Sequence, residues 1–110
     1  MNHKEIGNLG ETLASELLKR KGYHILERNY RCAYGEVDII AANRDKIAFV
    51  EVKTRLTDIC GDGRSAVDSK KRHRIHNAAG YYLSHTTTVF DDVDFQVVEI
   101  ALTHITDLRF

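Results

Sequence analysis

The chain of 110 residues has few cysteines, no formal net charge and no long apolar run, and each of these absences excludes a class of protein. Its 2 cysteines, Cys32 and Cys60, are too few for a disulfide framework, and neither lies in a C-x-x-C pair typical of zinc or redox sites. No stretch approaches the roughly 20 apolar residues that cross a membrane, and the polar N-terminus lacks the apolar core of a secretory signal. We therefore expect a cytoplasmic protein with free thiols and no membrane partner.

Several motifs of common enzyme classes are also absent. The chain contains no G-x-x-x-x-G-K-[ST] loop, no G-x-G-x-x-G fingerprint and no G-x-S-x-G elbow, so triphosphate-binding, dinucleotide-binding and hydrolase-elbow functions lack support. Charge is unevenly distributed, because KKRHR at 70–74 is strongly basic and DDVD at 91–94 is strongly acidic. A polyanion would have to meet a local basic face.

Apolar periodicity predicts one α/β domain over 1–110, with a mixed sheet flanked by helices in the order α-β-β-β-α-β. A first helix is expected over 4–21, and its core face would be formed by Ile6, Leu9, Leu13 and Leu17. Strands are expected at 23–31, 36–42, 47–53 and 94–102, with a loop at 56–64.

A second helix is expected at about 66–84. Ser65 and Asp68 resemble a capping box that would open it. One face of this helix would carry Val67, Lys71, Ile75, Ala78, Ala79 and Tyr82.

The stretch GEVDIIAANRDKIAFVEVKTR at 35–55 places charged residues in otherwise apolar strands, where they are costly unless something pairs with them. If the two strands form a hairpin centred on the NRDK turn, Asp38 lies opposite Glu51 and Glu36 lies opposite Lys53. Alternation then puts all four side chains on one face. The opposite face would hold Val37, Ile39, Val50 and Val52.

Directly opposed carboxylates destabilise a sheet unless one is protonated, both are solvated, or a cation binds between them. Mg²⁺ prefers such hard oxygen ligands, and Lys53 on the same face would stabilise charge on a phosphate or orient a water for attack. The pattern therefore suggests a metal site facing a phosphodiester. The alternative is a solvated sheet face on which Glu36 and Lys53 form a cross-strand ion pair.

Glu11 is a third carboxylate, about 200° from the neighbouring leucines of the predicted core face. Its own side of the helix carries mostly small residues, which would allow close approach to another element: Gly7, Ala14 and Leu18. Glu11 is either an exposed helical side chain or, if the helix packs beside the polar end of the hairpin, an outer metal ligand.

The basic second helix also has two interpretations. Lys70, Arg72 and Arg74 form either a solvated face or a set of phosphate contacts. Lys71 falls on the apolar stripe, so its ammonium is expected to reach out from a buried stem. His73 and His76 are expected on the surface rather than as a zinc pair.

Four segments resemble the bacterial YraN family of uncharacterised proteins, in order and spacing, over nearly the whole chain: GNLGETLASELLKRKGYHILERNYR, GEVDIIA, FVEVKTR, and AVDSKKRHRI with AAGYYL. The resemblance implies a restriction-endonuclease-like fold, similar to that of archaeal Holliday-junction resolvases. It also implies a Mg²⁺- or Mn²⁺-dependent endonuclease that acts on DNA, including branched or recombination intermediates.

Carried over by position, the resemblance makes Asp38 and Glu51 the metal ligands, Lys53 the catalytic lysine and Glu11 the accessory acid. Glu36 becomes a further accessory candidate. Lys71 matches a lysine that would touch substrate, beside the other basic residues of its helix. Resolvases of this type act as dimers, so a homodimer is expected.

The last strand departs from the family pattern. The family commonly has Arg-Phe-Asp-Val-Val where this chain has Asp94 and Gln96 at the charged positions. The proposed catalytic residues are untouched by this departure. A complete set of ligands does not by itself imply turnover, so two rival hypotheses stand beside the nuclease: a nucleic-acid-binding module that keeps the fold without turnover, and a protein-binding scaffold.

Overall fold

The computed structural model describes residues 2–56 and 68–102. Its elements, in chain order, are α1 (His3–Arg20), β1 (His24–Cys32), β2 (Gly35–Asn43), β3 (Lys46–Arg55), α2 (Ser69–His85) and β4 (Asp92–Ala101). The predicted α/β class and order α-β-β-β-α-β are confirmed. Ser65, Val67 and all but the first residue of the predicted 56–64 loop lie outside the described residues.

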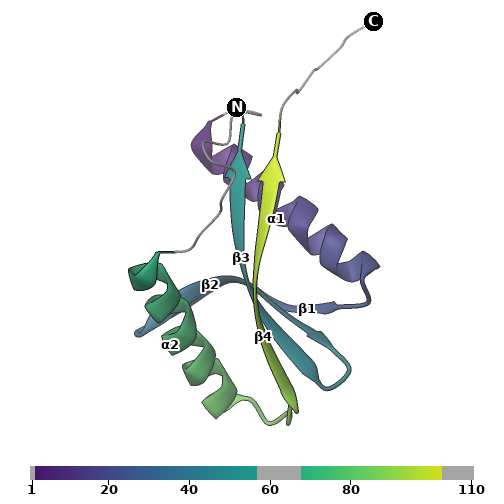
Figure 1. Cartoon of the computed structure of the whole chain (residues 1–110), viewed down its shortest axis with the longest axis vertical. Coiled ribbons are helices and arrows are strands. Elements are labelled where there is room, and N and C mark those ends of the chain that lie inside the picture. Colours follow the sequence, from purple (N-terminus) through teal and green to yellow (C-terminus); the bar gives the residue numbers. More distant parts are fainter. Residues whose placement is uncertain (1, 57–67, 103–110) are drawn as a thin grey trace, which may run out of the picture.

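The strands form one mixed sheet in the order β1-β2-β3-β4. The β1–β2 and β2–β3 pairs are antiparallel, whereas β3 and β4 are parallel. Parallel neighbours need a long crossover, and α2 lies in that connection. The two helices cover opposite faces of the sheet (Figure 1). Within the described parts of the chain, neither helix is long and apolar enough to cross a membrane.

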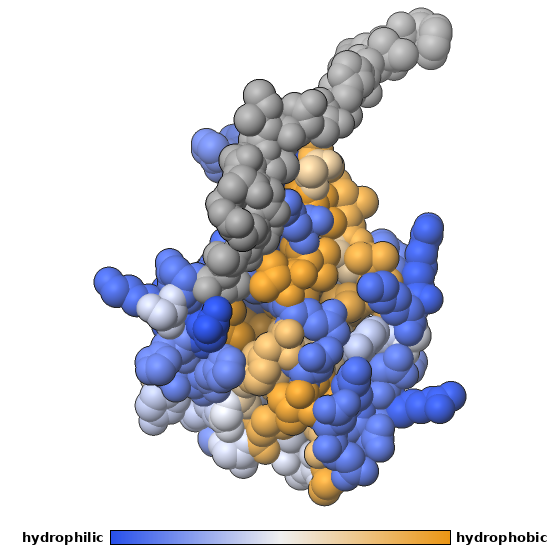
Figure 2. All heavy atoms as spheres, in the orientation of Figure 1, coloured by the Kyte–Doolittle hydropathy of each residue, from blue (hydrophilic) through white to orange (hydrophobic). Residues whose placement is uncertain are grey.

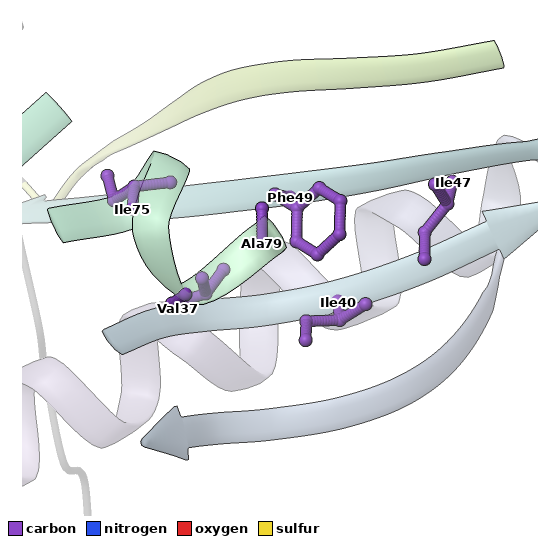
Figure 3. Close-up of a cluster of buried hydrophobic side chains, with 7 residues drawn as sticks. Val37, Ile40, Ile47, Phe49, Ile75 and Ala79 are labelled. Carbon is purple, nitrogen blue, oxygen red and sulfur yellow. The ribbon is translucent and has the colours of Figure 1, made fainter. Parts of the chain in front are cut away.

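Each helix buries its own set of apolar side chains against the sheet. Beneath α2 the core contains Val37, Ile40, Ile47, Phe49, Ile75, Ala78 and Ala79 (Figure 3). Beneath α1 it contains Ala14, Leu18, Ile39, Ala41, Ala48 and Val50. The predicted inner face of α2 is therefore confirmed over its described residues.

Val37 is an exception to the predicted alternation along β2. It packs beneath α2 together with Ile40, whereas Ile39 packs beneath α1, so the expected grouping of Val37 with Ile39 is wrong. The regular period of two is interrupted at Asp38, beside Asn29 of β1, whose φ is 52°. A left-handed residue changes the local twist of a strand and the direction of the side chains beside it.

The buried face of α1 also differs from the prediction. Gly10, Ala14, Ser15 and Leu18 are buried, whereas Leu13 and Leu17 are each 39% exposed. The helix packs through its small residues because they allow its backbone to approach the sheet. A Cβ atom on Gly10 would overlap the Thr54 hydroxyl of β3 and lie 2.8 Å from Thr54 Cβ.

A second close approach joins β2 to α2. A Cβ atom on Gly35 would overlap the carbonyl oxygen of Arg74 and lie 2.7 Å from its carbonyl carbon.

The helix α2 begins at Ser69, later than predicted, because Asp68 is its N-cap. Asp68 Oδ1 accepts a hydrogen bond from the Lys71 N–H at 2.8 Å. Asp68 is thus the N-cap itself, rather than the acidic residue three positions after the N-cap of a capping box.

β4 forms one edge of the sheet, and α2 leaves much of its near face uncovered. Val93, Phe95 and Val97 are 42%, 42% and 43% exposed. Figure 2 shows a band of apolar atoms down the centre of the same view in which Figure 1 places β4.

The Gly10–Thr54 contact predicts opposite results for two substitutions in α1. Gly10→Ala should lower the free energy of unfolding by about 1–3 kcal/mol, because the added methyl group overlaps Thr54. Gly7→Ala should raise it by about 0.5–1 kcal/mol, because a Cβ there meets nothing within 4 Å and alanine favours the helix. Urea unfolding followed by circular dichroism measures both, and equal effects would contradict the contact.

Candidate active site

The candidate site lies where β2 and β3 separate. Their paired residues run from Asn43–Lys46 to Ile39–Val50, which confirms the predicted register. At the next position the Asp38 carboxylate, rather than the β2 backbone, accepts the N–H of Val52 at 2.8 Å. β3 continues beside β4, so its distal end is freed from β2.

Asp38 and Glu51 meet at this point, as the register predicts. Glu51 is buried, with 3% of its surface exposed. Burial is the largest of the effects that raise the pKa of Glu51 to about 7. A hydrogen bond with Asp38 and the charge of Asp38 raise it further, whereas Lys71 lowers it. The two carboxyl groups thus lie against each other, and Glu51 holds a proton readily near neutral pH.

Lys71 provides the compensating charge. Its Nζ lies 2.5 Å from Oε2 of Glu51, so the side chain reaches from α2 down to β3. Burial alone would lower the pKa of Lys71, but the hydrogen bond and charge of Glu51, with the charges of Asp38 and Glu36, raise it overall. The sequence placed the Lys71 stem on the inner stripe but did not indicate this ion pair.

Lys53 shares a cleft with this pair. The cleft has a volume of about 330 Å³ and is lined by Glu51, Val52, Lys53, Thr54, Arg55 and Lys71. Among the described residues no carboxylate pairs with Lys53. Two ammonium groups and a buried carboxylate therefore line one opening at the free end of β3.

Glu11 approaches Asp38 from α1, on the other side of the sheet. Its side chain is 15% exposed, and Arg28 Nη2 lies 3.9 Å from its Oε1. Burial and the charge of Asp38 raise the pKa of Glu11, against opposing effects of Asn29 and Arg28. Oε1 is buried and has no hydrogen-bond partner within residues 2–56 and 68–102. The close packing at Gly10 brings this carboxylate to the site.

Glu36 is not part of the same cluster. Its Oε1 lies 3.1 Å from Arg74 Nη2, and its Oε2 lies 3.8 Å from Arg31 Nε. The expected pairing of Glu36 with Lys53 is absent from the described ion pairs, because β2 and β3 have already separated there. Of the basic helix residues, Lys70, Arg72 and Arg74 are exposed, whereas Lys71 is half-buried.

The carboxylates of the site can be compared with the ligands that a divalent cation takes. In the described part of the chain no group of three His, Cys, Asp or Glu side chains stands ready to hold a metal ion. Asp38 and Glu51 offer hard oxygen atoms in contact with each other, and an ammonium group already neutralises one of them. Mg²⁺ is commonly held by one or two carboxylates with water and substrate oxygens, so the two residues fit such an ion.

The two departures from the family pattern lie away from this cluster. Gln96 Nε2 donates to Asp94 Oδ2 at 2.9 Å and to the Tyr23 hydroxyl at 3.3 Å. Asp94 also pairs with Lys46 at 3.9 Å, at the hairpin end of the sheet. These contacts tie β4 to its neighbours and leave Asp38 and Glu51 unaffected.

Comparison with known proteins agrees with the family resemblance. Residues 10–100 match the model of the uncharacterised protein family UPF0102. The chain belongs to this family. A UPF0102 protein of Clostridium acetobutylicum is 44% identical over 105 residues, which are 96% of this chain and 86% of the relative. UPF0102 proteins of Moorella thermoacetica and Dictyoglomus thermophilum are 42% and 44% identical over 102 residues, which are 93% of this chain and 85% and 86% of those relatives. The matched region contains every candidate residue of this UPF0102 site.

The raised pKa of Glu51 predicts how stability depends on pH. The folded protein binds this proton more tightly than the unfolded chain does, so the free energy of unfolding should fall as the pH rises from about 4.5 through 7. The contribution is at most about 3 kcal/mol. Urea unfolding of the wild type and Glu51→Gln across this range measures it. The difference between the two proteins should change with pH, and parallel profiles would show that Glu51 titrates normally.

Proposed function

We propose that this UPF0102 protein is a Mg²⁺- or Mn²⁺-dependent endonuclease that hydrolyses phosphodiester bonds in DNA. The observation that carries the proposal is the buried Asp38–Glu51 carboxyl pair at the free end of β3, neutralised by an ammonium group and opening into the cleft of Lys53. Buried ionisable groups with perturbed pKa values are concentrated at functional sites. A purely structural role would not favour two carboxyl groups in contact.

The residues of the site would have different roles in this reaction. Asp38 and Glu51 would hold the cation, which when bound lowers the pKa of a water and neutralises charge on the phosphate. Lys53 would donate hydrogen bonds to the attacking water or to a non-bridging phosphate oxygen. Glu11, beyond Asp38, would hold a water of the site through Oε1, which lacks a hydrogen bond among the described residues.

Lys71 has a separate role in this proposal. Its ammonium occupies one Glu51 oxygen, so the same carboxylate cannot hold Lys71 and a cation equally well. When the site is loaded, Lys71 would exchange Glu51 for a phosphate oxygen of the substrate. Arg74 at 56% side-chain exposure, with the exposed Lys70 and Arg72, would extend this contact along the backbone of the DNA.

A homodimer acting on branched DNA follows from the family resemblance and remains part of the proposal. Two copies would present one site to each of two strands. A chain with no net charge gains basic surface by pairing, because each copy adds its own α2.

Cleavage assays test the catalytic assignment. Labelled linear, flapped and four-way DNA should be cut in Mn²⁺ by the wild type and protected by a chelator. Asp38→Asn, Glu51→Gln and Lys53→Ala should each reduce the rate by at least about 100-fold, since the first two weaken the hold on the cation and the third removes the ammonium group at the reacting phosphate.

Asp45→Asn is the matched control, because it removes a carboxylate at the β2–β3 turn, at the other end of the strands. It should cut at the wild-type rate. Full metal-dependent cleavage by Asp38→Asn from a clean preparation would overturn the assignment.

Lys71 gives a second, independent prediction. Lys71→Met keeps the length of the side chain and removes its charge, so Mn²⁺ should bind several-fold more tightly to the freed carboxylates. Cleavage should nevertheless slow, because the phosphate loses a contact. Calorimetric titration and cleavage rates measure the two effects. Weaker Mn²⁺ binding in this variant would show that Lys71 supports the metal site instead of competing for it.

The second candidate function is a nucleic-acid-binding module without turnover, and the observation in its favour is α2 itself. The helix carries four cationic side chains and no carboxylate. DNA binding without metal, steeply weakened by salt and by removal of Lys70, Arg72 and Arg74, together with no cleavage, would select this function.

A further inference from the structure

One ridge of α2 leads away from the candidate active site. Lys70, Arg74, Asn77 and Tyr81 are spaced at four, three and four residues, so they lie within about 60° of one another around the helix. All four are exposed. The ridge begins one residue from Lys71, which contacts Glu51, and Tyr81 lies about 16 Å along the axis from Lys70.

The far end of the ridge is an exposed aromatic cluster. Tyr34, in the β1–β2 turn, is 61% exposed and Tyr81 is 36% exposed, with ring centroids 5.5 Å apart. His85 lies on the next turn of α2, and its ring centroid is 4.2 Å from that of Tyr81. Tyr30 and Tyr82, in contrast, pack edge to face against the core beneath α2. Core packing accounts for those two tyrosines but not for Tyr34 and Tyr81.

A cleft opens beside these rings. It has a volume of about 470 Å³ and is lined by Tyr34, His76, Asn77, Gly80, Tyr81 and Ser84. A Cβ atom on Gly80 would meet nothing within 4 Å, so the helix surface is open at this point. The Asn77 amide and the His76 ring supply polar groups beside the two tyrosine rings. The Ser84 hydroxyl already donates to the Tyr81 carbonyl oxygen at 2.7 Å.

The geometry points to a stacking site for an unpaired nucleobase, formed by Tyr34 and Tyr81 over Gly80. Aromatic faces bind bases of any sequence, and basic side chains on the same ridge, Lys70 and Arg74, match the charge of the backbone that carries them. A base inside a duplex is stacked on both faces and paired along one edge, so only a base of a single-stranded stretch can enter the cleft. The inference deepens the proposed function, on which it rests, by naming the substrate class. This class is nucleic acid with unpaired nucleotides about 15 Å along α2 from Lys71.

Binding without metal tests this site apart from catalysis. Labelled oligothymidine, oligouridine and a blunt DNA duplex are titrated in chelator and followed by fluorescence anisotropy. Wild type should prefer the single strands. Tyr81→Ala should weaken single-strand binding by about 5- to 100-fold, since stacking on one aromatic side chain accounts for an effect of this size, and should change duplex binding less than about twofold. Tyr81→Phe should bind as wild type does.

Two further variants keep the result independent of folding. Gly80→Leu fills the cleft and leaves both rings in place, so it should also weaken single-strand binding. Leu13→Ala is the matched control, because Leu13 is 39% exposed on α1, across the sheet, and it should bind as wild type does. The chain contains no tryptophan, so Tyr81→Trp adds a single reporter whose fluorescence should be quenched by the oligonucleotide.

The outcomes separate the two proposals. Tyr81-dependent single-strand binding without cleavage supports the stacking site and rejects the nuclease. Cleavage with no effect of Tyr81→Ala and Gly80→Leu on single-strand binding rejects the stacking site and keeps the nuclease. Equal weakening of single-strand and duplex binding also rejects it, because Tyr81 would then be a backbone contact. Equal binding of oligouridine and oligothymidine by the wild type, with the same loss in Tyr81→Ala, supports a stacking site that needs neither the 2′-hydroxyl nor the thymine methyl group.

Discussion

The site depends on one hydrogen bond, from the Val52 N–H to the Asp38 carboxylate. In a continuing antiparallel ladder a backbone carbonyl would satisfy this N–H, and β2 would stay beside β3. The carboxylate ends the ladder instead, and a hydrogen bond to a charged group contributes about 1.5–3 kcal/mol, which offsets part of the loss of further ladder bonds. Glu51 and Lys53 therefore lie at an opening, while the pairing with β4 keeps their backbone fixed.

Two glycines then bring side chains to this opening from both faces of the sheet. Gly10 lets α1 approach Thr54, which carries Glu11 towards Asp38, and Gly35 lets α2 approach β2, in the turn of helix that follows Lys71. The resulting cluster is costly to the fold, because carboxyl groups are buried together and the ammonium of Lys71 compensates for only one of them. A fold selected for stability alone would place apolar residues there, so the cost is itself an argument for function.

Local sequence patterns predict the part of this arrangement that depends on the β2–β3 hairpin. A two-residue turn and a period of two determine the hairpin register, so the meeting of Asp38 and Glu51 could be foreseen. The position of Val37 could not, because the Asp38 hydrogen bond and the left-handed Asn29 interrupt the period. The apolar periodicity of α1 also predicted the wrong buried face. It picks out the large apolar residues, whereas Gly10 and Ala14 set the distance at which the helix packs on the sheet. The Lys71–Glu51 ion pair joins residues 20 apart in the sequence, and only the tertiary fold shows it.

In the two proposals, binding and chemistry lie in different parts of this protein, and electrostatics gives a reason for the separation. The carboxyl cluster repels a phosphate until its charge is neutralised, so it cannot supply affinity for nucleic acid by itself. The ridge of α2 can, because it carries no carboxylate and salt screens charges over about 8–10 Å, a shorter distance than the ridge itself. A net charge of zero therefore says little about this surface. Arg74 is held by Glu36 close to the site, whereas Tyr81 at the far end offers a contact that salt does not weaken. A strand bound along the ridge would reach the Lys53 cleft at the end marked by Lys71, without needing the carboxyl cluster to attract it.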